Sequence, residues 1–225
     1  MLAGCNSCEH WPVYIGLNLR PLFQEARMQS AHRLLSAAVL AVASASSFAT
    51  TLYTSSGSFL ANIAPGRYTE SFNALVNPVP VGPVAFSSGG FSYAVSAPGD
   101  LYASGEFLGT SLPNEAVTVT FTSGNVSAVG ANFYAVNLSD EFQAVSLALT
   151  LSDGTIVSFT PTSVTDSYRG FASNVTLTSL TISAPGVSLY SGLDNLTVGV
   201  VPEPASWVLM GLGLTGLLWA RRRAA

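Results

Sequence analysis

The feature that most constrains the fold is a regular alternation of apolar residues with Thr or Ser. It runs through residues 117–122, 147–152 and 178–183. Successive residues of a β-strand point to opposite faces of a sheet, so each segment places its apolar side chains on one face. Between residues 50 and 200 no stretch of useful length has the period of a helix. The pattern therefore predicts an all-β domain with a polar face built from hydroxyl groups.

Turn residues separate these segments. Asp153–Gly154 lies between the segment 147–151 and an apolar segment at 156–159, and Asp-Gly is a strong hairpin dipeptide. Residues 76–83 contain three prolines, which favours a loop or an edge connection. We count about nine to eleven short strands between residues 50 and 200. This pattern indicates a single antiparallel β-sandwich of jelly-roll type.

The chain also carries the pattern of a secretory signal peptide. A short, mildly basic start at Met28 is followed by an apolar run at 34–42 and then by small residues. This order leads us to assign a signal peptide to residues 28–49. The small residue Ala49 favours cleavage between Ala49 and Thr50. Signal peptidase is therefore a predicted partner.

Two features of this end have alternatives. Residues 43–45 offer a second candidate cleavage position. Residues 1–27 precede the leader, and we interpret them as an upstream over-extension, with translation starting at Met28; a start at Met1 is the alternative. Their Cys-x-x-Cys pair resembles half of a metal site, but a zinc site needs four ligands and the sequence offers no second pair.

The other end contains a second apolar run. Residues 205–220 carry no charge, and three arginines follow them. Sixteen helical residues span about 24 Å, which is short for a hydrocarbon core of about 30 Å. Trp207 and Trp219 at the two interfaces, with snorkelling Arg side chains, extend the reach of such a helix. We therefore predict one short transmembrane helix at 205–220 and a cytoplasmic basic tail at 221–225.

The segment 201–225 resembles a known sorting signal. A Pro-Glu-Pro element at 201–204, an apolar run and an Arg cluster follow one another in the order of the PEP-CTERM signal of Gram-negative bacteria. The matching polar and proline residues are Pro202, Glu203, Pro204, Arg221, Arg222 and Arg223. The resemblance implies recognition by an exosortase, a membrane-embedded Cys-dependent enzyme, at or near Pro-Glu-Pro. It also implies transient residence in the inner membrane, a host that makes extracellular polysaccharide, and delivery to the cell surface or matrix.

Few reactive side chains remain in the predicted mature domain. After removal of residues 1–49, the chain contains no His, Cys or Lys. This excludes His-based triads, Cys nucleophiles, Schiff-base chemistry and ordinary zinc sites. Between residues 50 and 201, nine carboxylates against two arginines give a net charge of −7. Such a surface argues against nucleic acid as a partner, and we predict a domain without catalytic residues.

Two kinds of binding stay open for the domain. We predict no cofactor; the alternative is a structural calcium ion, with Asp194 and Asn195 as ligands beside a turn acid such as Asp100 or Asp140. The segment 194–199 also resembles the closing strand of many jelly-roll carbohydrate-binding modules. Tyrosine rings can stack on sugars, although most of them are expected in or near the core. The candidates are Tyr53, Tyr68, Tyr93, Tyr102, Tyr134, Tyr168 and Tyr190.

Three functions follow from these features. The leading one is an exported surface or extracellular-matrix protein with a structural or adhesive role linked to exopolysaccharide or biofilm. The second is a carbohydrate-binding module for extracellular polysaccharide. The third, a glycan-active hydrolase, needs two carboxylates that face each other across a deep cleft. A concave sheet face with two or more exposed tyrosines and a nearby calcium ion favours the second function, and a flat Ser/Thr surface with neither feature favours the first.

Overall fold

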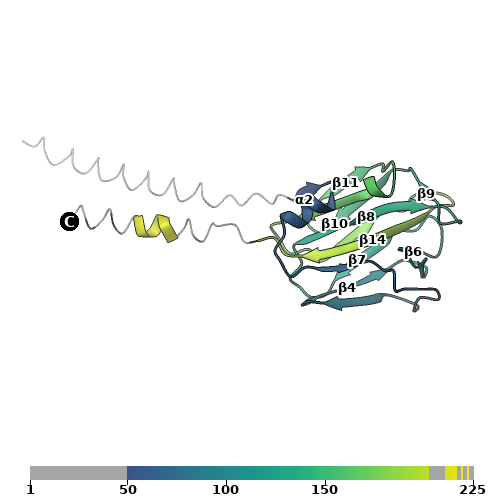
Figure 1. The fold of residues 1–225 in the computed structure, drawn as a ribbon, viewed down its shortest axis with the longest axis horizontal. Helices are drawn as coiled ribbons and strands as arrows, with labels where there is room; N and C mark the ends of the chain where they lie inside the picture. The colour runs from purple at the N-terminus through teal and green to yellow at the C-terminus, as the bar shows by residue number, and fades with distance from the viewer. Residues whose placement is uncertain (1–49, 203–210, 217–218, 220–221, 223–225) are drawn as a thin grey trace, which may run out of the picture. The chain divides into compact units, whose positions relative to one another are not determined.

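The computed structural model describes residues 50–202, 211–216, 219 and 222, and residues 50–202 form two antiparallel β-sheets (Figure 1). The first sheet has eight strands. Its main path runs in the order β1-β12-β8-β14-β6-β5, while β2 pairs with β14 and β9 pairs with β8. The strands are β1 Thr51–Tyr53, β2 Tyr68–Glu70, β5 Leu101–Ala103, β6 Leu108–Thr110, β8 Ala128–Val136, β9 Phe142–Gln143, β12 Tyr168–Ala172 and β14 Tyr190–Gly199.

The second sheet contains the segments with alternating Thr and Ser. It has six strands in the order β11-β10-β13-β7-β4-β3. The strands are β3 Val84–Ser88, β4 Phe91–Ser96, β7 Val117–Phe121, β10 Leu147–Leu151, β11 Ile156–Phe159 and β13 Ser179–Ile182. The three predicted segments become β7, β10 and β13, which lie side by side. The predicted β10–β11 hairpin also forms, with Leu151 N–H donating to the Thr155 carbonyl at 2.9 Å.

The two faces of this sheet differ as the alternation requires. On β7, Val117, Val119 and Phe121 are buried, while Thr120 between them is exposed. Hydroxyl groups on the outer face form hydrogen bonds between neighbouring strands. The Thr118 Oγ1 of β7 lies 3.3 Å from the Thr181 Oγ1 of β13. Paired hydroxyls satisfy one another without charge, which explains how a chain with 9% charged residues presents a polar surface.

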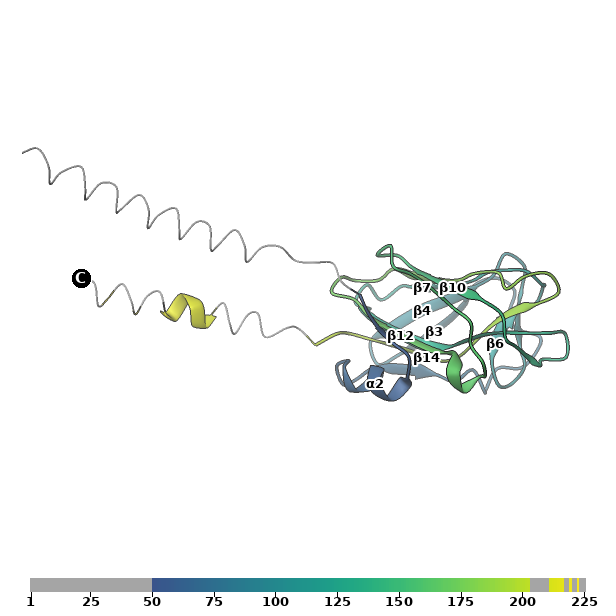
Figure 2. The ribbon, with the colours of Figure 1, turned by 90° about the horizontal axis from the view of Figure 1, so that it is seen from above.

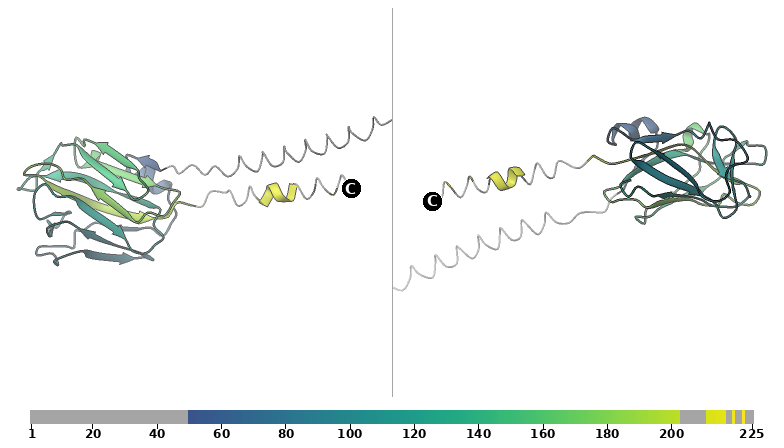
Figure 3. Two further views of the ribbon diagram at one scale, coloured as in Figure 1. Left: turned by 180° about the vertical axis from the view of Figure 1, so that it is seen from behind. Right: turned by 90° about the horizontal axis from the view of Figure 1, so that it is seen from below.

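The main hydrophobic core contains side chains from both sheets. Val119, Leu149 and Leu180 contribute from the second sheet, and Phe133 and Leu193 contribute from the first; all five are fully buried. Figures 2 and 3 show the same strands from above, from behind and from below. The predicted all-β sandwich is therefore confirmed, and its assignment to the jelly-roll type stays a prediction.

A short helix that the sequence analysis missed packs on the outside of the first sheet. Helix α2, Ser56–Ala61, contacts β12 and β8, and Figure 2 shows it beside β12. Its Phe59 is fully buried against Gly130 and Gly170, which are directly opposed in β8 and β12. Six residues are too few for a periodic signal. The sequence signal that marks this helix is its N-cap residue, Ser55, whose side chain accepts from Ser58 N–H at 3.3 Å.

Between residues 50 and 200 the structure has fourteen strands, more than the nine to eleven or so expected from the sequence. The surplus includes β1, β2, β5, β6 and β9, which have two or three residues each and cannot show an alternation. Strands β8 and β12 show little alternation of apolar and polar residues in the sequence, for another reason. Their residues are buried on both faces, because α2 and a 3₁₀ turn at Thr165–Ser167 contact the first sheet.

Most of the predicted processing segments lie outside the described residues. These are the over-extension at 1–27, the signal peptide at 28–49 and most of the apolar run at 205–220. Within that run, residues 211–216 are helical, and the Thr215 hydroxyl donates to the Gly211 and Leu212 carbonyls at 3.0 and 2.9 Å. Across the parts of the chain that are described, no helix has the length and apolarity needed to cross a bilayer.

Candidate functional site

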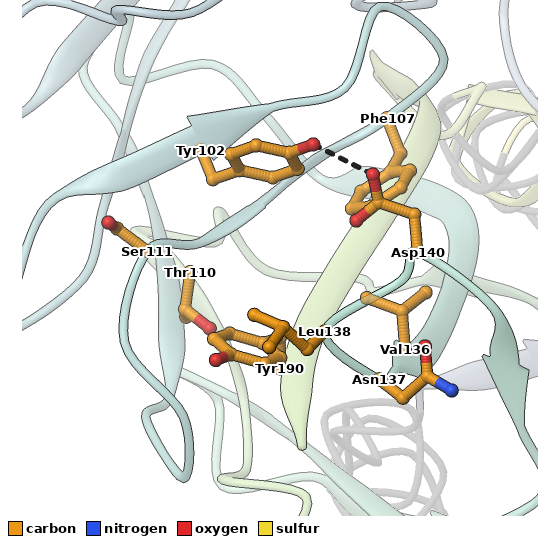
Figure 4. Close-up of a pocket in the computed structure, with 9 residues that line it drawn as sticks. All are labelled: Tyr102, Phe107, Thr110, Ser111, Val136, Asn137, Leu138, Asp140 and Tyr190. Carbon is orange, nitrogen blue, oxygen red and sulfur yellow. Dashed lines mark hydrogen bonds between the residues drawn. The ribbon is translucent and has the colours of Figure 1, made fainter. Parts of the chain in front are cut away.

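A small cavity lies where β5, β6 and the start of β14 approach the turn after β8 (Figure 4). It is partly open to solvent and has a volume of about 130 Å³. Aromatic rings and polar groups share its wall, and Figure 4 shows Tyr102 and Tyr190 on two sides of it. The lining residues are Tyr102, Phe107, Thr110, Ser111, Val136, Asn137, Leu138, Asp140 and Tyr190.

An aromatic cluster on the outer face of the first sheet forms one side of this cavity. Phe107 and Tyr134 are buried there with ring centroids 5.7 Å apart, and Tyr102 and Tyr190 pack against them half-buried. A glycine makes room for the Phe107 ring, because a Cβ at Gly192 of β14 would lie 3.2 Å from it. Strand alternation turns Tyr102 outward, while its neighbours in β5 are buried in the core.

A tight turn after β8 supplies the acidic group of the cavity. The Asn137 side-chain oxygen accepts from Ser139 N–H at 2.9 Å and from Glu141 N–H at 3.1 Å, which is the pattern of an Asx turn. Asp140 in this turn has a φ of 61°, in the left-handed region that Asp tolerates. The turn places its carboxylate beside β5, where Tyr102 Oη donates to Asp140 Oδ2 at 2.7 Å.

The electrostatic field around the cavity is negative. The hydrogen bond to the Asp140 carboxylate raises the pKa of Tyr102. Burial, with the nearby charge of Glu106, raises the pKa of Asp194 although Asn195 N–H donates to it. Burial also raises the pKa of Tyr134, and the charges of Asp194, Glu106 and Asp140 add to that shift. An anionic ligand therefore meets repulsion here.

One hydroxyl in the wall of the cavity has no partner. Thr110, the last residue of β6, is 1% exposed, and its Oγ1 makes no hydrogen bond within the described part of the chain. Figure 4 shows this oxygen directed toward the Tyr190 ring. Most buried polar groups in folded proteins are hydrogen-bonded, and one that is not costs about 1–3 kcal/mol. The oxygen is itself buried, so a ligand in the cavity reaches it only if a neighbouring side chain such as Tyr190 moves aside.

The seven candidate tyrosines are divided as the sequence analysis expected. Tyr93, Tyr134 and Tyr168 are buried, and the other four are half-buried. Tyr102 and Tyr190 are brought together by the fold, and Asp140 joins them. Thr110 and Phe107 were missed by sequence reasoning, because nothing in a short β-strand signals that its Thr is buried without a partner.

The predicted calcium ligands lie next to one another at an irregularity in β14. Asn195 has a φ of 53°, and the register of β14 against β8 shifts between Asp194 and Thr197. Asp194 accepts from Asn195 N–H at 2.6 Å and from the Asn195 side-chain amide at 2.7 Å. Asp140, but not Asp100, lines the same hollow as Asp194.

Among the residues that the structure describes, no three acidic, His or Cys side chains gather closely enough to hold a metal ion. Calcium at Asp194 and Asn195 stays a prediction. If calcium binds there, a chelator is expected to lower the unfolding temperature of the protein.

The C-terminal strand is hydrogen-bonded up to the start of the Pro-Glu-Pro element. Val200 carbonyl accepts from Ala64 N–H at 2.9 Å, and Val201 N–H donates to the Ser127 hydroxyl at 2.9 Å. Val201 also packs against the cluster around Phe59. The next residue, Pro202, is exposed. The element therefore starts directly at the edge of the folded domain.

Of the other predicted sorting residues, Arg222 is described and is helical. The remaining four, Glu203, Pro204, Arg221 and Arg223, lie outside the described residues.

The predicted signal-peptide cleavage site also borders the folded domain. Thr50, the residue after Ala49, precedes β1 directly, and its hydroxyl donates to Asp153 Oδ2 at 2.5 Å. Asp153 also accepts from the Ser173 hydroxyl at 2.9 Å and from Thr155 N–H at 2.9 Å. Burial opposes ionisation of Asp153, but these hydrogen bonds outweigh it and lower the pKa of the carboxyl.

This arrangement predicts a specific effect of removing the Asp153 charge. Cleavage after Ala49 leaves an α-amino group on Thr50 near the carboxylate, so Asp153→Asn is expected to destabilise the processed protein by about 1 kcal/mol. Because the folded pKa lies below the unfolded value near 3.9, the contribution is present above that pH and is lost as the pH falls through the folded pKa. Urea unfolding of both forms between pH 3 and 7 measures it.

The exposed Asp100 provides the control, since Asp100→Asn is expected to leave the unfolding free energy unchanged. N-terminal sequencing should show that the processed chain begins at Thr50. A difference between wild type and Asp153→Asn that is equally large at pH 3 and pH 7 would contradict the assignment.

Comparison with known proteins identifies one segment of the chain. Residues 200–223 match the family model described as the PEP-CTERM protein-sorting motif. No curated protein and no solved structure matches the chain. The match covers the Pro-Glu-Pro element, the apolar run and the Arg cluster, and so confirms the resemblance seen in the sequence. The chain therefore ends in a PEP-CTERM protein-sorting motif, which indicates an exported protein targeted to an exosortase.

Proposed function

We propose that this protein is a non-catalytic component of the cell surface or extracellular matrix, with a structural or adhesive role linked to exopolysaccharide. The observation that supports this most directly is the junction between β14 and the sorting motif. Pro202 follows Val201, whose N–H donates to the Ser127 hydroxyl of the sandwich, so processing at or near Pro-Glu-Pro releases the complete sandwich with almost no tail. What the sorting step delivers is therefore the folded domain itself.

The surface chemistry of the domain supports a structural role over a catalytic one. The outer face of the second sheet carries hydroxyl groups from Thr and Ser, which exchange hydrogen bonds readily with water and with polyhydroxylated polymers. Of the two arginines in the domain, Arg169 is only 9% exposed and donates to the Asp166 and Tyr168 carbonyls. The accessible charge is thus mainly that of carboxylates, which favours neutral polysaccharides as neighbours.

Fractionation of cells tests this proposal. In a host that produces exopolysaccharide, we expect a processed form of the protein in the matrix fraction and little of it in the inner membrane. A strain that lacks the protein is expected to form a less cohesive matrix, measured as the shear stress at which surface-grown cells detach. Exclusive recovery in the inner membrane, or unchanged cohesion in the deletion strain, would argue against the proposed role.

A carbohydrate-binding module is the second candidate function. It is favoured by the cavity that holds Tyr102 and Tyr190, because two half-buried rings beside polar groups provide the kind of surface on which sugars stack. The two candidates are compatible, since binding of polysaccharide at one cavity is a way for a matrix protein to be retained.

A further inference from the structure

The unpaired hydroxyl of Thr110 indicates that the cavity beside it is a binding site. The side chain is 1% exposed, and its Oγ1 has no partner in the described part of the chain. A valine in the same place would fill the same volume without the cost of an unsatisfied polar group. The hydroxyl becomes favourable if a ligand moves the Tyr190 ring aside and then donates to the Thr110 hydroxyl or accepts from it.

The other walls restrict the chemistry of this ligand. Tyr102 and Tyr190 are half-buried, so part of each ring is accessible from the cavity, and both pack against the buried cluster that contains Phe107. Asp140 uses Oδ2 for Tyr102, and among the described residues no donor reaches its Oδ1. The exposed Ser111 adds another hydroxyl. The ligand thus needs apolar C–H faces for the rings and hydroxyl groups for Thr110 and Asp140.

We propose that this cavity binds one neutral hexose unit of a polysaccharide. A pyranose ring combines C–H faces with hydroxyl groups around its edge, which is the combination that the walls require. The volume of about 130 Å³ is below the roughly 300–1,000 Å³ of pockets for drug-sized ligands, so it suits a single ring at a time. The inference rests on the proposed function, because a surface or matrix protein meets polysaccharide in its working environment.

Charge distinguishes a neutral sugar from an acidic one. The free Oδ1 of Asp140 accepts a hydrogen bond from a sugar hydroxyl but repels a carboxylate. Glu106 and Asp194 lie close enough to Tyr134 to raise its pKa, so further negative charge stands beside the cavity. A uronic acid of the same ring size is therefore expected to bind more weakly than the corresponding neutral hexose. A purely apolar ligand is disfavoured as well, because it leaves Thr110 and Asp140 unpaired.

Titration calorimetry with the full chain tests the proposal, in a zwitterionic detergent that carries no sugar. The probes are D-glucose, D-galactose, D-mannose and D-glucuronic acid. At least one neutral hexose is expected to bind with a Kd of about 1 mM, as suits a ligand of this size. Tyr190→Ala is expected to weaken that binding about tenfold. Thr110→Val is expected to weaken it about 3- to 10-fold while the unfolding temperature stays the same or rises.

A threonine on the other sheet provides the matched control. Thr118→Val removes a hydroxyl from the outer face of β7, far from the lining residues, and is expected to leave the Kd unchanged. The proposal is overturned if no neutral hexose binds below about 10 mM, if glucuronic acid binds as tightly as the hexoses, or if Thr110→Val binds like wild type. Sorting of these variants is measured separately, so a negative titration with normal fractionation rejects the sugar site and leaves the proposed location intact.

Discussion

Replacing Pro202, Glu203 and Pro204 by alanine is expected to leave nearly all of the protein unprocessed in the inner-membrane fraction. Proline has no backbone N–H and fixes φ, so we expect the element to be extended and unable to continue the ladder of β14, and the glutamate provides its single charge. Alanine removes both properties and is a strong helix former, so we expect helical structure to spread through the element toward the domain. Immunoblotting of membrane, surface and matrix fractions for the full-length and shortened chains measures the effect.

An exposed turn in the β-sandwich domain supplies the control for the Pro202–Pro204 variant. Pro98→Ala with Asp100→Ala also removes a proline and a carboxylate, and both residues are exposed and lie outside the sorting motif. This double variant is expected to be processed like wild type. Normal surface delivery of the Pro202–Pro204 variant would show that the element is not needed for sorting.

The second large effect is expected where α2 meets the first sheet. A Cβ at Gly170 would lie 2.7 Å from two atoms of the Phe59 ring, which is itself fully buried. Gly170→Ala is therefore expected to destabilise the domain by about 2–3 kcal/mol, which lowers the unfolding temperature by roughly 5–10 °C. Phe59→Ala removes a buried ring and is expected to cost about 3–5 kcal/mol. Thermal and urea unfolding of the full chain in detergent measure both.

A double variant separates the steric clash from a general sensitivity of the strand. In a Phe59→Ala background the ring is gone and only the Cβ of residue 59 stays 3.0 Å from the added Cβ, so the additional cost of Gly170→Ala is expected to fall below about 1 kcal/mol. Gly57→Ala in the same helix is the control, because nothing lies within 4 Å of its added Cβ, and it is expected to be neutral or slightly stabilising. Additive losses for Gly170→Ala and Phe59→Ala would contradict the proposed packing.

Strands with one face open to solvent could be predicted from the sequence, whereas strands buried on both faces could not. Strands β7, β10 and β13 were predicted because their outer face is open to solvent, so Thr and Ser alternate with buried residues along them. Strand β12 carries no such pattern, because all five of its residues are buried. Helix α2 covers part of that strand, and a covering helix erases the alternation on which the prediction depends.

The sorting motif and the cavity differ in how far each can be recognised from the sequence alone. The sorting motif is contiguous, so its order of parts could be read directly and was confirmed at residues 200–223. The cavity is assembled from distant segments: Tyr102 and Asp140, which share a hydrogen bond, are 38 residues apart. Their meeting depends on the pairing of β14 with both β6 and β8, and that register is a property of the fold.

The position of β14 also decides how the domain responds to mechanical load. This strand leads directly to the sorting motif, with β8 along one side and β6 and β2 along the other. Its hydrogen bonds run perpendicular to the strand, so tension applied through the C-terminal end loads them together in shear. At the other end, β1 is an edge strand that pairs with β12 alone in the sheet order. Under tension between its two ends, the domain is therefore expected to keep the hydrogen bonds of β14 and to lose those between β1 and β12 first.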